Sequence, residues 1–166
     1  MTMPSSGQHL AADDGDAWWF LDTRMTVKAD SQRTGGLYTM IEFSAPQGFG
    51  PPQHVHRDED EAFLILEGGM RVVCGDETWQ AEPGSFVFLP RGVPHSFIVT
   101  EGPAVRGWQL TTPAGFEKFV AALGEPAPGP GLPQPTEPDV PTLARISAEH
   151  GYDIVGPPLN LDDLRR

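Results

Sequence analysis

Short runs of β-branched and aromatic residues recur along most of the chain, and turn-forming residues separate them. Between Trp18 and Leu110 a new run begins roughly every eight to twelve residues, which is the spacing of strands in an antiparallel sandwich or small barrel. Several runs alternate apolar and polar residues, as a strand with one buried face does. We therefore predict an all-β body with strands at residues 18–21, 25–29, 37–43, 54–56, 61–66, 70–74, 78–81, 86–89, 95–99 and 104–110.

The pattern changes after Thr112. Residues 114–123 carry apolar side chains at the spacing of one helix face, and Gly124 follows as a stop signal. A proline-rich connector covers 126–138, and residues 142–150 predict a second short helix. We divide the chain into a flexible arm at 1–16, a β-barrel at 17–112 and a helical, proline-rich extension at 113–166.

A chain of 166 residues most simply forms one domain around one core. Its net charge of −12 argues against binding to nucleic acid or to anionic membranes, since both attract basic surfaces. The N-terminus lacks the basic start and apolar run of a signal peptide, so we expect a cytoplasmic protein. The single cysteine, Cys74, lies on a predicted strand, where we expect it to be buried.

Two histidine clusters carry the candidate chemistry. His54 and His56 are two residues apart on a predicted strand, so their side chains project to the same face. Glu61 begins the next apolar strand, and His95 follows a corner built from prolines and a glycine. Three imidazoles and one carboxylate would hold a divalent transition metal if the fold brings them together.

Other residues compete less well for these roles. Glu59 is a rival carboxylate, but it lies in a charged turn, whereas Glu61 begins an apolar strand. His9 lies in the polar N-terminal arm, where we expect a solvated side chain. His150 lies at the end of a predicted helix, where a cation complements the helix dipole. We therefore assign neither His9 nor His150 to the metal.

The spacing of both clusters resembles the two motifs of the cupin superfamily. The first reads G-x5-H-x-H-x4-E-x6-G from Gly48 to Gly68, and the second reads G-x5-P-x-G-x2-H from Gly84 to His95. The asparagine that usually closes the second motif is replaced by Val99, and that asparagine is not a metal ligand in the family. The resemblance implies an antiparallel cupin β-barrel, or jelly-roll sandwich, with one or two C-terminal helices packed outside it. It also implies one metal ion bound by His54, His56, Glu61 and His95.

This ligand set suits Fe, Mn, Co, Ni, Cu or Zn, and the sequence does not choose among them. Three neutral imidazoles and one carboxylate leave a divalent centre with a positive charge, which favours an anionic oxygen ligand such as a phenolate or enolate. A metal inside a barrel also needs an apolar cavity beside it. Candidates for its lining are Tyr38, Met40, Phe63, Ile65, Phe86, Phe88, Phe97 and Trp108.

Within the cupins, the chain is similar to small single-domain proteins of the bacterial quercetin 2,3-dioxygenase type. The residues that carry this likeness are Trp19-Phe20, Thr34-Gly35-Gly36, the run from His54 to Phe63, the run from Pro90 to His95, and the run from Thr112 to Phe116. The likeness implies a metal-dependent dioxygenase that acts with dioxygen on a flavonol or another enolisable aromatic. Glu61 would then be the catalytic base as well as a ligand.

Three alternatives remain open from the sequence. The metal could serve a non-redox isomerase, cyclase or epimerase. The barrel could instead bind a small ligand as a sensor, or it could have kept the motif and lost its natural substrate. We also expect a homodimer, in which a partner subunit covers the apolar run Trp18-Trp19-Phe20.

Overall fold

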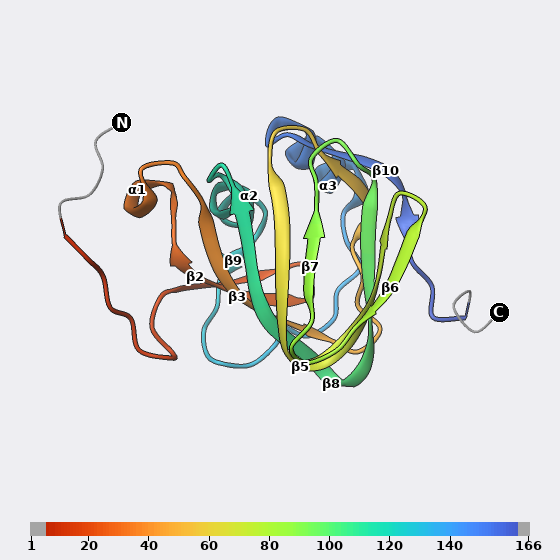
Figure 1. Cartoon of the computed structure of the whole chain (residues 1–166), viewed down its shortest axis with the longest axis horizontal. Helices are drawn as coiled ribbons and strands as arrows, with labels where there is room; N and C mark the ends of the chain where they lie inside the picture. Colours follow the sequence, from red (N-terminus) through yellow and green to blue (C-terminus); the bar gives the residue numbers. More distant parts are fainter. Residues whose placement is uncertain (1–5, 163–166) are drawn as a thin grey trace.

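The computed structural model describes residues 6–162 and is built mainly from antiparallel strands (Figure 1). Its strands are β1 (Asp16–Phe20), β2 (Thr23–Ala29), β3 (Thr39–Pro46), β4 (Pro52–His56), β5 (Asp60–Cys74), β6 (Glu77–Ala81), β7 (Phe86–Leu89), β8 (His95–Thr112), β9 (Glu125–Pro126) and β10 (Tyr152–Pro158). Its helices are α1 (Ser31–Thr34), α2 (Phe116–Leu123) and α3 (Val140–Glu149). The predicted all-β antiparallel body is confirmed. No helix in residues 6–162 is long and apolar enough to cross a membrane.

The hydrogen-bonded sheet follows the order β10-β4-β8-β3-β2-β1-β9, and β5 pairs with β6, β7 and β8 beside this path. The path ends at β10 and β9 without returning on itself, so the expected closure into a barrel is wrong. The sheet curves around the core, but hydrogen bonds between strands do not close it into a barrel.

Two long strands, β5 and β8, replace four of the shorter strands that the sequence predicted. They lie side by side along most of their length (Figure 1). Their register shifts between Ile65 and Met70, which is the gap left between the predicted strands 61–66 and 70–74. Gly68 has a φ of 69°, and a Cβ there would lie 2.4 Å from the carbonyl oxygen of Ala104. Only glycine therefore lets the two strands bend together at this point.

The C-terminal extension contributes a strand that the sequence analysis missed. In α2, the apolar stripe is confirmed, since Phe116, Phe119 and Val120 are buried. After α3, however, β10 returns antiparallel to β4, with Tyr152 opposite His56. The extension is therefore part of the same sheet as the cupin-like strands, and it reaches the predicted metal ligands.

The same extension covers the apolar run at the start of the ordered body. Phe20 is buried, and its ring packs edge-to-face against Phe119 of α2 with centroids 5.1 Å apart. The indole nitrogen of Trp19 donates a hydrogen bond of 2.9 Å to the carbonyl oxygen of Gly131. The run is therefore not left bare in the single chain, since Phe20 is buried and Trp18 and Trp19 are half-buried, and the expected homodimer stays a prediction. Cys74 is buried, as predicted.

The first part of the predicted arm lies outside the described residues, up to residue 5. Residues 6–15 form no helix or strand, but they are tied to β2 through Lys28. The Lys28 ammonium donates a 2.7 Å hydrogen bond to the carbonyl oxygen of Ala12. The side chain of Gln8 in turn donates to the Lys28 carbonyl oxygen at 2.8 Å. These hydrogen bonds hold the segment against β2, although its residues are mostly exposed.

Candidate metal centre

The four predicted ligands come from three strands and meet in the interior. His54 and His56 project to one side of β4, because they are two residues apart on a strand. His54 is the cross-strand partner of His95 on β8, and Glu61 is buried at the start of β5. One ligand atom from each of the four residues lies within 4.8 Å of those of the other three. This cluster could hold a single metal ion.

Hydrogen bonds on the outer side of the rings orient two of the histidines. Nδ1 of His54 lies 2.7 Å from the carbonyl oxygen of Pro52, and Nδ1 of His95 lies 3.0 Å from that of Val93. A carbonyl oxygen only accepts, so each Nδ1 carries the proton. In a neutral ring, Nε2 then keeps its lone pair, which is the form that binds a metal.

The donor atoms of this cluster fit a metal ion. Nε2 of His95 and both ring nitrogens of His56 are buried and have no hydrogen-bond partner among the described residues. Buried polar atoms are normally paired, so unpaired ring nitrogens clustered around a carboxylate indicate a binding site for a cation. Three imidazole nitrogens with one carboxylate oxygen are the donor set of a divalent transition metal.

Glu61 holds the centre of this network. Its Oε2 lies 3.3 Å from Nε2 of His95 and 3.9 Å from Nε2 of His56. Its Oε1 accepts a hydrogen bond from the side-chain amide of Gln109 on β8. Burial would raise the pKa of Glu61, but His56 and the two other histidines lower it to about 2. The carboxylate is therefore ionised at neutral pH, as a metal ligand must be.

The histidines differ in their affinity for protons. Burial lowers the pKa of His54, with a further decrease from His95, and it lowers the pKa of His56 to about 4. For His95, burial also disfavours the proton, but its contact with Glu61 outweighs this effect and raises the pKa. Two of the three imidazoles are therefore neutral and ready for a metal at neutral pH.

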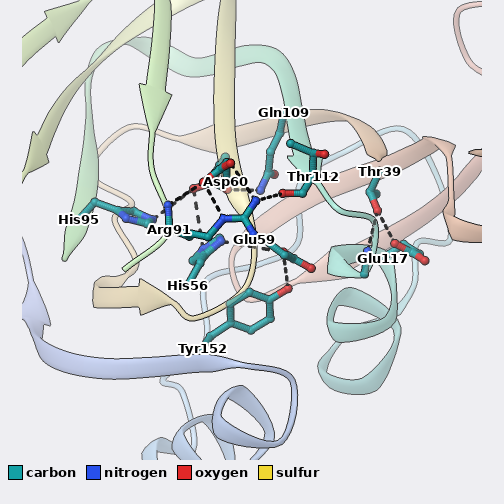
Figure 2. A network of polar contacts seen from close by, with 12 residues as sticks. Thr39, His56, Glu59, Asp60, Arg91, His95, Gln109, Thr112, Glu117 and Tyr152 are labelled. Atoms are coloured by element: carbon teal, nitrogen blue, oxygen red, sulfur yellow. Dashed lines mark hydrogen bonds and ion pairs between the residues drawn. The ribbon is translucent and has the colours of Figure 1, made fainter. Parts of the chain in front are cut away.

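A second carboxyl group lies beside the ligands. Glu59 is buried and accepts a 2.8 Å hydrogen bond from the hydroxyl of Tyr152 (Figure 2). Its Oε2 lies 3.9 Å from Nδ1 of His56. Burial raises the pKa of Glu59 to about 7, although the Tyr152 hydrogen bond opposes this increase. Glu59 is outside the ligand cluster, as predicted, but it is not the solvated turn residue that the sequence indicated.

An interior cavity of about 80 Å³ opens beside the ligands. His54, His56 and Glu61 line it, and most of its remaining wall is apolar. Among the predicted lining residues, Phe63 and Phe97 are in this wall. Ile65 is fully buried in the core but does not line the cavity.

The other five predicted lining residues lie outside this cavity, four of them on the outer face of the sheet, so these predictions are wrong. Phe86 and Phe88 are 69% and 51% exposed, whereas Val87 and Leu89 point inward. Adjacent residues of a strand face opposite sides of the sheet, and for these strands the set predicted to face inward is the outward-facing one. The four outer-face residues are Met40, Phe86, Phe88 and Trp108. Tyr38 is exposed in the segment just before β3.

Several cavity residues were missed because they belong to the C-terminal extension. Its two helices and β10 supply Phe116, Phe119, Leu143, Tyr152 and Ile154. The helix-period stripe at 116–123 was the available signal, because such a stripe must pack against something. The helices therefore cover the cavity and do not merely pack outside the sheet.

Comparison with known proteins supports the resemblance to cupins that the two sequence motifs indicated. Residues 41–106 match the model of the cupin domain family. A segment of 88 residues is 31% identical to quercetin 2,3-dioxygenase of Bacillus subtilis (strain 168). That segment is 53% of this chain but only 26% of the Bacillus protein. The chain thus spans about a quarter of the length of this curated relative.

Solved structures with a similar fold carry several different names. KdgF from Halomonas sp. aligns with a TM-score of 0.59 at 16% identity, over 68% of this chain and 99% of its own. The polyketide cyclase RemF from Streptomyces resistomycificus aligns with a TM-score of 0.56 at 24% identity, over 65% of this chain and 80% of its own. At these identities the likeness concerns the fold alone.

Proposed function

We propose that this cupin superfamily protein, whose cupin domain covers residues 41–106, is a metal-dependent dioxygenase acting on a small enolisable aromatic such as a flavonol. The sequence likeness to the Bacillus quercetin 2,3-dioxygenase supports the reaction class. The assembled ligands His54, His56, Glu61 and His95 support a metal at its centre. A bound divalent ion would supply a positive centre for the substrate oxygen and for dioxygen.

The lining of the cavity is the observation that carries this proposal. Its titratable side chains are the ligands His54, His56 and Glu61, together with Tyr152, whose hydroxyl is committed to Glu59. Isomerases and epimerases commonly place a further acid or base at the reacting carbon. The described part of this cavity offers none, so chemistry driven by a metal and dioxygen suits it better.

Glu61 accepts the hydroxyl proton of the substrate in this proposal. Its carboxylate is ionised, and Gln109 holds one oxygen while the other faces the ring nitrogens. The substrate then enters as an oxygen anion, which the positive centre favours. The apolar walls formed by Phe63, Phe97 and Phe116 exclude water and pack against an aromatic ring.

The cavity volume restricts the substrate. About 80 Å³ is well below the roughly 300–1,000 Å³ of typical ligand pockets. A flavonol can enter only if side chains of the covering helices, such as Phe119 and Leu143, move aside. Smaller enolisable compounds fit with less rearrangement, so they belong in any substrate panel.

Oxygen uptake tests the proposal. Apoprotein is reconstituted separately with Fe, Mn, Co, Ni, Cu and Zn, and each form is tested with flavonols and with smaller enolisable aromatics. We expect uptake with at least one metal and its loss in Glu61→Gln, but not in Glu77→Gln, a matched change at an exposed glutamate. Turnover without oxygen would instead identify an isomerase or cyclase. Binding without turnover under every metal would identify a sensor.

A further inference from the structure

The environment of His56 differs from that of the other two histidines. The Nδ1 atoms of His54 and His95 face backbone carbonyl oxygens. Nδ1 of His56 has no hydrogen-bond partner in the described chain, and Oε2 of the Glu59 carboxyl group lies 3.9 Å from it. This distance exceeds that of a hydrogen bond by about 1 Å. A metal-bound histidine normally donates its outer N–H to a carboxylate or carbonyl oxygen.

Glu59 is held in place from two further elements. The hydroxyl of Tyr152 on β10 donates to Oε2 at 2.8 Å, and the Tyr152 ring packs edge-to-face on His56 at 4.7 Å. Oε1 lies against Gly115 at the start of α2, where an added Cβ would come within 2.6 Å of it. The carboxylate therefore sits in a space that Gly115 leaves open. It does not line the metal cavity.

We propose that Glu59 is a positioning residue for the metal centre, that it accepts the Nδ1 proton of His56, and that Tyr152 holds it in place. This inference rests on the proposed metal site. It makes the C-terminal strand β10 part of the metal centre, because Tyr152 reaches His56 only through the return of that strand.

Metal affinity and a metal spectrum test this assignment without any substrate. Protein loaded with Co(II) is compared for wild type, Glu59→Gln and Tyr152→Phe, with a chelator competition for affinity and the visible Co(II) absorption for geometry. We expect one Co(II) per chain in all three, about 10- to 100-fold weaker binding in both variants, and a shifted spectrum. Asp58→Asn is the matched control, since Asp58 is an exposed carboxylate on the same loop.

The possible outcomes separate this inference from the proposed function. If wild type binds no metal, the proposed function fails with it. If wild type binds Co(II) and Glu59→Gln behaves like Asp58→Asn, only the positioning role is overturned. Complete loss of bound metal in Glu59→Gln would make Glu59 a ligand and would also overturn the role. Tyr152→Phe keeps the ring, so it reports on the hydrogen bond even if Glu59→Gln folds poorly.

A different observation concerns the outer face of the sheet. Four neighbouring strands carry two apolar rows on this face, in register across the sheet. One row is Phe88, Ala62, Leu110 and Met40, and the other begins with Phe86, Leu64 and Trp108. Phe86, Phe88 and Leu64 are 69%, 51% and 40% exposed. A contiguous apolar patch of this kind is a candidate interaction surface.

The charges around this apolar sheet face cancel. Lys28 pairs with Glu42 at 3.8 Å, Arg91 pairs with Asp60 at 2.9 Å, and Arg106 pairs with Glu42 and Glu67. Three cations therefore balance three carboxylates on a chain whose net charge is −12. Two copies of this acidic chain can approach through this face without bringing unpaired like charges from these side chains together.

From this neutral face we infer that a second copy of the chain packs on it, sheet against sheet, in a symmetric dimer. Sedimentation at micromolar concentration tests the inference. We expect wild type at twice the 18.0 kDa chain mass and the double variant Phe86→Asp, Phe88→Asp at 18.0 kDa, with unchanged circular dichroism. Trp79→Asp, at an exposed aromatic residue on β6, should leave the dimer intact. A monomeric wild type, a dimeric double variant, or equal dissociation of Trp79→Asp would each overturn it.

Discussion

Gln109 donates a hydrogen bond from its side-chain amide to Oε1 of Glu61. This bond fixes the rotation of the carboxylate and turns Oε2 toward the ring nitrogens of His95 and His56. Oε1 of Gln109 is buried and has no hydrogen-bond partner in the described chain, which lowers the stability of the fold. A glutamine at this position is therefore explained by the bond that its amide group donates to Glu61. Gln109 therefore contributes to the metal centre although it is not a ligand.

Removing this bond should weaken the metal site. In Gln109→Leu the side chain keeps a similar volume but no longer restrains Glu61. We expect metal affinity to fall about 10- to 100-fold, as for other residues that orient ligands. Chelator competition measures the change, and Gln47→Leu, at an exposed position, is the control. Equal affinity in the two variants would contradict the role of Gln109.

Loss of a ligand should have a larger effect. Elemental analysis of purified wild type should find close to one transition metal per chain, and His54→Ala or His95→Ala should reduce it strongly. His9→Ala removes an imidazole from the exposed N-terminal segment and serves as the control. Metal content that is the same in wild type and both ligand variants would refute the site.

Glu59 should make the stability of the metal-free protein depend on pH. Its pKa in the folded chain is about 7, above the ordinary 4.5, so the folded state holds a proton that the unfolded state releases between these values. The stabilisation is therefore complete below pH 4.5 and is lost as pH rises toward 7. The histidines act in the same range, but they are common to wild type and Glu59→Gln. We expect wild type to lose stability relative to Glu59→Gln as pH rises across this interval, as denaturant titrations of both proteins at several pH values would show.

The sequence allowed the ligand set to be predicted because strand geometry is local. His54 and His56 must share a face if the segment is a strand, and Glu61 and His95 follow at motif spacing. The inward face of β7 could not be predicted, because both faces of this strand are apolar. One face carries Phe86 and Phe88, and the other carries Val87 and Leu89. Tertiary pairing with β5 alone decides it.

Two contacts at the site could not be predicted from the hydrophobic pattern of the sequence. On β8, Trp108 faces outward and the polar Gln109 faces inward, because Glu61 offers a partner inside. The segment 152–158 contains a glycine and two prolines, so it gave no strand signal. Its pairing with β4 across nearly a hundred residues of sequence places Tyr152 beside His56. Such contacts depend on the assembled fold.

The covering of the cavity by α3 gives the last prediction. Leu143 is 6% exposed and lines the cavity, so Leu143→Ala should lower the unfolding free energy by about 2–4 kcal/mol. Leu37→Ala deletes the same atoms from a side chain that is 55% exposed, and it should cost less than about 0.5 kcal/mol. The enlarged cavity should also bind flavonols more tightly relative to smaller enolisable aromatics. Denaturant unfolding and ligand titration measure the two effects, and equal stability of the two variants would show that α3 does not seal the site.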